Sequence, residues 1–216
     1  DHLAVGTLAH CTEQIVYSQA SNGAEHAAFE RIDADAPAPD IQYIMAPTEP
    51  DPDRPDRPDE AVLLLFSVHL RPRSRGVIAL RSADPFDHPG IDPRYFSDPR
   101  DLETHVEGVK RAREIMGASA LDAYRGAIIQ PDEQIQSDDG LAEFVRQNAT
   151  TLYHPVGTCK MGRDALAVVD DRLRVHGVEG LRVVDASIMP RITSGNTNAP
   201  TIVIAERAAD MIGAAG

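Results

Sequence analysis

The sequence predicts an α+β fold, in which an antiparallel sheet with flanking helices is followed by a strand–loop–helix ending. Three observations carry this prediction. Short β-rich runs occupy the first half of the chain, two helical patterns follow them, and the last third ends in an apolar strand pattern, a loop and a helix. An ending of this kind is typical of the ligand-binding edge of an α/β domain.

Length, composition and charge exclude several classes of protein. The 216 residues are 42% hydrophobic and 25% charged, which is ordinary for a folded protein whose core needs no disulfide or metal. A net charge of −13 argues against nucleic acids and anionic membranes as partners. Cys11 and Cys159 do not make a secreted disulfide pattern, and we find no signal peptide and no apolar stretch that could span a bilayer. These features favour a cytoplasmic location, and the missing initial methionine suggests a processed, cleaved or truncated product.

Four β-rich runs are predicted in the first half, at residues 14–17, 41–45, 62–70 and 76–82. The last two are joined by a short loop that begins at Arg71, so we expect them to pair as a hairpin. Residues 47–60 are rich in proline and aspartate and predict an exposed loop. This loop is interpreted as a solvated connector, and a lid over a site is the alternative. Residues 84–99 are expected to be irregular.

Two helices are predicted in the middle of the chain. The first begins with Asp98 as N-cap and Pro99 in the first helical position, and it ends at Gly117. We expect Glu107 and Arg111 to pair on its surface. Its apolar residues recur at helical spacing: Leu102, Val106, Val109 and Met116. The second helix is expected over residues 139–148, with Leu141, Phe144 and Val145 on one face.

The last third predicts strands at residues 171–175 and 181–184, with a turn at His176 and Gly177 between them. The second strand ends in Asp185, and a loop then leads to a helix over residues 200–212. No G-x-G-x-x-G pattern occurs, so the usual phosphate-binding loop of a nucleotide-binding α/β domain is absent from this sequence.

Residues 153–162 (YHPVGTCKMG) form the first candidate site. His154 lies between an aromatic residue and a proline, so its backbone is restricted, and this suits a base that must be held in position. A structural histidine that bonds to a backbone carbonyl is the alternative. His154 and Cys159 alone do not make a metal site, because two ligands without a further pair nearby are too few. No metal is expected.

Two further clusters lie near the carboxyl end. Residues 194–201 end a loop and begin a helix, with Asn198 as the expected cap and Pro200 in the first turn. The positive end of that helix would stabilise an anion, or a group that becomes anionic during a reaction. Asp185 lies at the carboxyl end of an apolar strand, where α/β folds bind ligands. Capping alone is the alternative for both clusters.

The three clusters together resemble the glucose–methanol–choline (GMC) oxidoreductases, most of all their choline dehydrogenase-like group. The matching runs are residues 153–162, 180–190 (GLRVVDASIMP) and 195–201 (GNTNAPT), in the family's order and spacing. The resemblance extends over essentially the whole chain. Only the carboxyl-terminal portion of such an enzyme is represented, because the βαβ unit that begins the family's FAD-binding domain is absent.

The resemblance implies an FAD-dependent alcohol dehydrogenase or oxidase acting on a primary alcohol such as choline. His154 would take the hydroxyl proton, and Asn196 would hydrogen-bond the substrate oxygen. Six residues would bind the cofactor. Asp185 and Ala186 would lie near the flavin phosphates and ribityl chain, and the other four would lie at the start of the last helix beside the ring: Thr197, Asn198, Pro200 and Thr201.

The same resemblance implies how the chain is divided. Residues 1–20 would be a residual FAD-domain or linker segment, residues 21–150 the substrate-binding domain, and residues 151–216 the catalytic loop with the last part of the FAD domain. The missing amino-terminal FAD-binding half would be a partner, either as a separate chain or in a longer protein. We expect the isolated chain to be inactive. A hydroxynitrile lyase of the same family and a flavin-free, non-catalytic fragment are the alternatives.

Overall fold

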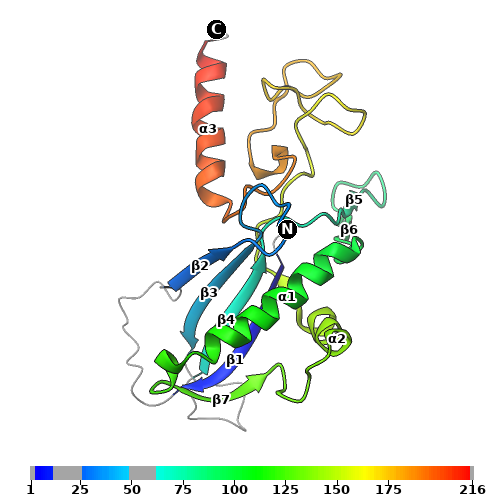
Figure 1. Cartoon of the computed structure of the whole chain (residues 1–216). Helices are drawn as coiled ribbons and strands as arrows, with labels where there is room; N and C mark the ends of the chain where they lie inside the picture. The colour runs from blue at the N-terminus through cyan, green and yellow to red at the C-terminus, as the bar shows by residue number, and fades with distance from the viewer. Residues whose placement is uncertain (1–2, 12–25, 49–61, 215–216) are drawn as a thin grey trace. The chain divides into compact units, whose positions relative to one another are not determined.

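The computed structural model describes residues 3–11, 26–48 and 62–214 (Figure 1). The chain divides into two compact units. The first, called here the sheet unit, comprises Leu3–Leu70 and Pro99–Leu152. The second, called the C-terminal unit, comprises Asp1–His2, Arg71–Asp98 and Tyr153–Gly216. The strand predicted at residues 14–17 lies outside the described residues, and so does most of the loop predicted at residues 47–60. The first two residues of that loop, Pro47 and Thr48, instead end the strand that begins at Ile41.

The sheet unit is built on one antiparallel sheet, as the sequence predicts. Its strands run in the order β2-β3-β4-β1-β7, with β8 paired to β1. Their bounds are β1 Leu3–Cys11, β2 His26–Glu30, β3 Ile41–Thr48, β4 Val62–His69, β7 Arg125–Gln130 and β8 Thr150–Thr151. β4 is central: Leu3 of β1 and Ile41 of β3 both lie opposite His69. The α+β prediction is therefore confirmed, including the strand that begins at Ile41.

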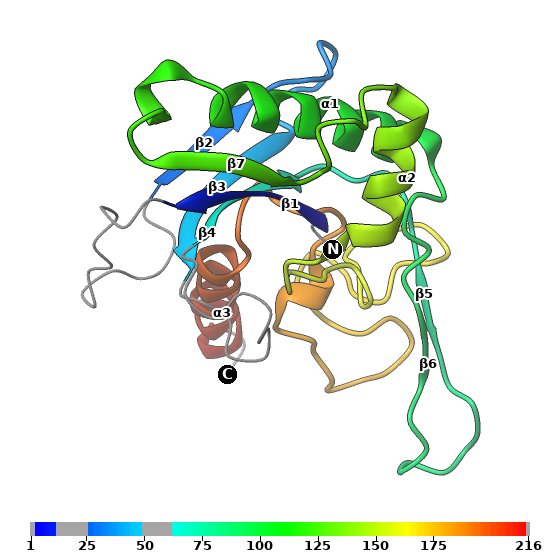
Figure 2. The same cartoon turned by 90° about the horizontal axis from the view of Figure 1, so that it is seen from below.

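Helix α1, Pro99–Met116, lies along one face of this sheet (Figure 2). Its start and end agree with the prediction. The face that it buries includes Ala112 and Met116, which pack in one cluster with Ile41, Tyr43 and Leu65 of the sheet. The predicted surface pair is wrong, because Arg111 pairs with Glu114 at 2.6 Å and Glu107 pairs with Lys110 at 2.7 Å.

Helix α2, Asp138–Asn148, buries Leu141, Phe144 and Val145, as predicted. Ser137 is its N-cap, and the backbone N–H of Gly140 donates to the Ser137 hydroxyl at 3.1 Å. This cap was not among the features predicted from the sequence. It satisfies one of the N–H groups that a helix start leaves without an internal partner.

Replacing Ser137 by alanine is expected to lower the free energy of unfolding by about 1 kcal/mol, the usual worth of such a cap. Urea denaturation followed by far-UV circular dichroism measures this change. Ser137→Thr keeps the hydroxyl and serves as the control, so it should lie close to the native protein. If the two variants lost the same free energy of unfolding, the capping role would be wrong.

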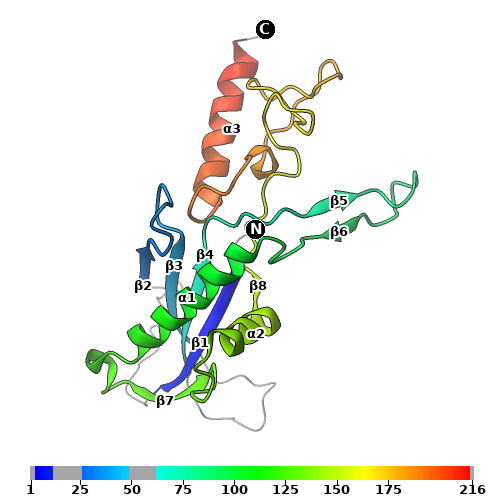
Figure 3. The same ribbon diagram turned by 45° about the vertical axis from the view of Figure 1, so that its right-hand side comes forward.

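The predicted hairpin between residues 62–70 and 76–82 is wrong. β5, Val77–Ala79, pairs instead with β6, Gly90–Asp92, within the C-terminal unit (Figure 3). The reason is that β4 already has a partner on each edge, β1 and β3, so no edge is left for β5. The stretch expected to be irregular supplies β6, because a short β-run needs a neighbouring strand to satisfy its backbone groups.

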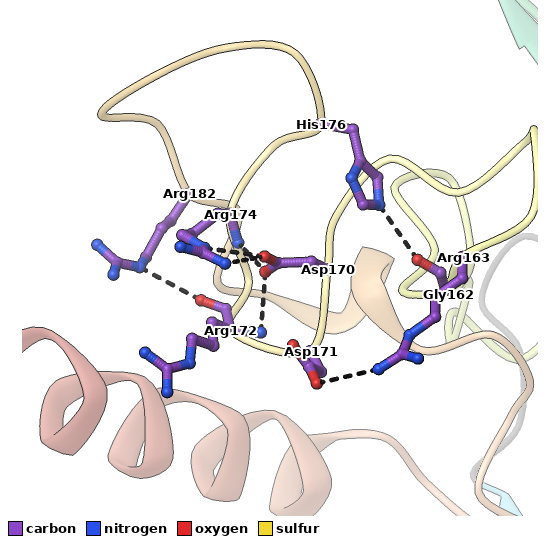
Figure 4. Close-up of polar contacts among 8 residues, drawn as sticks. All are labelled: Gly162, Arg163, Asp170, Asp171, Arg172, Arg174, His176 and Arg182. Atoms are coloured by element: carbon purple, nitrogen blue, oxygen red, sulfur yellow. Dashed lines mark hydrogen bonds and ion pairs between the residues drawn. The ribbon is translucent and has the colours of Figure 1, made fainter.

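The prediction of strands at residues 171–175 and 181–184 is also wrong. Among the described residues this region makes only isolated bridges, Val169 with Val175 and Arg174 with Arg182. Asp170 organises it: its carboxylate accepts from the backbone N–H groups of Arg172 and Arg174, both at 2.9 Å, and from the Arg174 guanidinium (Figure 4). The Arg174 hydrogen bond is the main reason that the Asp170 pKa is lowered to about 2.

The core of the C-terminal unit joins this region to the last helix. Val169, Leu173, Ile188 and Ala208 are its buried members. Helix α3, Asn198–Gly213, agrees closely with the predicted helix, and the 3₁₀ turn η2, Ala186–Ile188, precedes it. No described helix is long and apolar enough to cross a membrane. The three domain ranges expected from the sequence stay a prediction.

Candidate functional site

His154 lies on the loop that follows β8. Tyr153 before it has a φ of 63°, and Gly157 after it has a φ of 87°, a value that glycine adopts without steric cost. Backbone hydrogen bonds fix the rest of the loop against η2: Cys159 N–H donates to Ser187 O at 3.0 Å, and Met161 N–H donates to Ile188 O at 2.8 Å. Two of the three clusters identified in the sequence are thus neighbours.

The imidazole of His154 meets the third cluster. The amide Nδ2 of Asn196 lies 2.8 Å from His154 Nε2. On the other side of the ring, the Thr197 hydroxyl lies 3.0 Å from Nδ1. His154 and Asn196, 42 residues apart in the sequence, are therefore in direct contact.

The surroundings of His154 lower the pKa of its imidazole below the ordinary value for histidine, because partial burial disfavours the charged ring. A neutral imidazole has one nitrogen with a lone pair and can accept a proton. At neutral pH the ring is thus in the form that a general base requires.

The loop that carries Asn196 is held by an arginine from a distant part of the chain. Arg71 Nη1 donates to the Ser194 hydroxyl at 2.6 Å, and Ser194 has a φ of 59°. Both residues belong to the C-terminal unit. From the sequence, Arg71 is expected only in a hairpin loop. The proline that follows Arg71 restricts the backbone of Arg71 sterically, and this is the one signal in the sequence of a fixed backbone there.

The start of α3 differs from the prediction in its cap. Thr197 is the N-cap and Asn198 is the first helical residue. The Thr197 side chain makes no cap hydrogen bond, and the Thr197 carbonyl accepts from Thr201 N–H at 3.0 Å and from the Thr201 hydroxyl at 2.7 Å. N–H groups of the first turn therefore remain directed at whatever precedes the helix. Pro200 lies in that turn, where its missing N–H costs nothing.

Asp185 has a defined local role. It is the N-cap of η2, and its carboxylate accepts from the Ser187 backbone N–H at 2.8 Å. The side chain of Asp185 is exposed, and Ala186 is half-buried in the turn that follows. In the described residues we find no group of three or more His, Cys, Asp or Glu side chains that could hold a metal ion.

Comparison with known proteins places these features in a family. The family model of the GMC oxidoreductases matches residues 72–205, which is more than half of the chain and includes His154, Asp185 and Asn196. The chain belongs to the GMC oxidoreductase family.

Individual relatives within the GMC family are similar at the sequence level. The chain is 47% identical over 197 residues to an oxygen-dependent choline dehydrogenase of Paraburkholderia xenovorans, covering 89% of this chain and 34% of that protein. It is 44% identical over 196 residues to an alcohol dehydrogenase [acceptor] of Pseudomonas putida, covering 89% and 35%. The chain thus spans about a third of these relatives, and it corresponds to their carboxyl-terminal portion.

A solved structure agrees with the fold. The crystal structure of pyridoxine 4-oxidase from Mesorbium loti matches with a TM-score of 0.85 and 32% identity, covering 97% of this chain and 42% of that one. Sequence similarity and structural similarity therefore both support the family and the mixed fold.

Proposed function

We propose that this chain forms the carboxyl-terminal part of an FAD-dependent alcohol oxidoreductase of the choline dehydrogenase-like group, acting on a primary alcohol such as choline or a related alcohol. The single observation that carries the proposal is the 2.8 Å contact between His154 Nε2 and Asn196 Nδ2. It joins a neutral base to an amide donor, the two groups that removal of a hydroxyl proton requires.

His154 acts as the base. A substrate hydroxyl that donates to Nε2 replaces the Asn196 amide as the partner of that lone pair, and the proton of the O–H bond passes to the nitrogen. The Asn196 amide then donates to the substrate oxygen, where negative charge develops. A donor that is already fixed in position stabilises this charge without the cost of reorganising solvent.

The start of α3 fits the expected cofactor. Its first-turn N–H groups lack a side-chain cap, so they suit an acceptor-rich, electron-accepting ring. When FAD is bound, its flavin supplies the hydride-accepting chemistry. Thr197, Asn198, Pro200 and Thr201 would border the flavin. Asp185 and Ala186 would lie nearer its ribityl chain, since a carboxylate accepts hydrogen bonds from hydroxyls but repels phosphate.

Anaerobic addition of alcohols to the complete FAD-containing protein tests this function. We expect the flavin absorption to bleach with choline or a related primary alcohol. Unchanged flavin absorption, together with release of a carbonyl product from a cyanohydrin, would instead indicate the lyase alternative. For the 216 residues alone we expect no turnover without an amino-terminal FAD-binding part, supplied in the same protein or as a second chain.

The pH dependence of the reaction follows from the state of His154. A base works only when neutral, so kcat/KM should reach a plateau above the His154 pKa and fall as the pH drops through it. Because burial lowers that pKa, the midpoint should lie below the ordinary histidine value of about 6.5. A profile of kcat/KM against pH measures it. A midpoint at or above that value would contradict the neutral-base assignment.

A further inference from the structure

The hydroxyl of Thr197 is not used in the way that its position in the fold suggests. Thr197 is the N-cap of α3, and a threonine at this position ordinarily accepts a hydrogen bond from an N–H of the first turn. In this chain it makes no such bond. The residue is nonetheless only 8% exposed, and its hydroxyl lies 3.0 Å from His154 Nδ1.

The partners of the His154 ring determine which nitrogen carries the proton. A neutral imidazole has one N–H donor and one acceptor. The Asn196 Nδ2 group can only donate, so Nε2, 2.8 Å away, must be the acceptor. Nδ1 then carries the hydrogen, and the Thr197 oxygen, 3.0 Å away, is in position to accept it.

One contact would favour the opposite tautomer, in which Nδ1 has the lone pair. The backbone N–H of Thr197 also faces Nδ1, and as a donor it would need a lone pair there. Its distance is 3.5 Å, beyond the usual range for an N–H hydrogen bond, whereas the hydroxyl lies at 3.0 Å. A hydroxyl can donate or accept, so the Asn196 amide decides: because it can only donate to Nε2, Nδ1 carries the hydrogen and the nearer hydroxyl accepts it.

We propose that Thr197 is a positioning residue for His154: its hydroxyl accepts the hydrogen bond of Nδ1–H and so keeps the lone pair on Nε2, the nitrogen that faces Asn196. In this role the Thr197 hydroxyl acts through His154 and not through contact with the substrate hydroxyl. Helix α3 therefore lacks a side-chain cap from Thr197. In return, the hydrogen bond to Nδ1 holds His154 in one tautomer and one ring orientation. This inference deepens the proposed function, in which His154 Nε2 takes the substrate proton.

The first test is nitrogen-15 NMR of the histidine rings in this chain, with His154→Gln used to assign its signals. The shifts of the two ring nitrogens show directly which one is protonated. We expect Nδ1–H in the native chain above the His154 pKa, and a mixture with more Nε2–H in Thr197→Val, which keeps the shape but lacks the hydroxyl. Thr197→Ser should restore the native tautomer.

This spectroscopic result is independent of the proposed function, because it needs no flavin and no alcohol. A native ring protonated on Nε2, or a tautomer unchanged in Thr197→Val, would overturn the role of Thr197 even if alcohol oxidation were demonstrated. If Thr197→Val does not fold, the native tautomer and the Thr197→Ser variant still decide the matter.

A second readout uses the complete FAD-containing protein. Thr197→Val should lower kcat/KM about tenfold, the worth of roughly one hydrogen bond, and Thr197→Ser should recover most of this loss. A loss of the same size in both variants would indicate a merely structural role and would overturn the proposal.

Discussion

His154→Gln in the complete FAD-containing protein is expected to lower kcat/KM for the alcohol on the order of 10²–10⁴-fold, the usual contribution of a positioned general base. Glutamine keeps the length and polarity of the side chain, but its amide cannot take up a proton near neutral pH. Steady-state rates and the anaerobic rate of flavin bleaching measure the loss. Both should fall together, because the base acts in the step that precedes or accompanies hydride loss.

The chain offers a matched control for this change. His176 is exposed, lies in the same unit and makes a hydrogen bond through Nε2 with the Gly162 carbonyl at 3.1 Å, not with Asn196 (Figure 4). His176→Gln should leave the rate unchanged. If His154→Gln were as active as this control, the assignment of the base would be wrong.

Gly108→Ala is expected to destabilise the sheet unit even though alanine favours helices. A Cβ at Gly108 would lie 2.3 Å from the Ser67 hydroxyl and 3.3 Å from Ile41 Cδ1, and Ser67 is fully buried on the central strand. Overpacking of this kind costs about 1–3 kcal/mol, and the helix propensity of alanine returns only about 1 kcal/mol. Urea denaturation followed by far-UV circular dichroism measures the net loss.

A double-mutant cycle with Ser67→Ala isolates this contact. The buried Ser67 hydroxyl has no hydrogen-bond partner within the described part of the chain, so its removal alone should be neutral or stabilising. In Gly108→Ala/Ser67→Ala the clash with the hydroxyl is gone, and we expect a coupling energy of about 1–3 kcal/mol in favour of the pair. Simple additivity of the two changes would show that helix α1 and strand β4 do not meet as closely as the structure indicates.

The elements that sequence reasoning located well share one property: their determinants are local. The 3.6-residue repeat of α1, with Pro99 at its start and Gly117 at its end, and the apolar face of α2 are visible without knowledge of the fold. The composition around Ile41 also identified β3. The predicted sites rested on the family's motifs, which assign His154 and Asn196 separate roles toward the same substrate oxygen.

The errors concern pairing between segments. The hairpin after β4 was expected because adjacent β-runs usually pair, yet both edges of β4 are taken by strands from elsewhere. The runs at 171–175 and 181–184 have strand-like composition but make only isolated bridges among the described residues, since a ladder needs a neighbouring strand in register. No local pattern contains that information.

The sequence by itself determined the helices, the family and the identity of the two residues proposed for catalysis, because each depends on short-range patterns or on motifs within a few residues. Only the tertiary structure decided which groups meet. It joined Arg71 to Ser194, and it turned the hydroxyl of Thr197 away from the helix start and toward His154. A capping threonine and a positioning threonine are identical in sequence, because the choice between them depends on a partner 43 residues away.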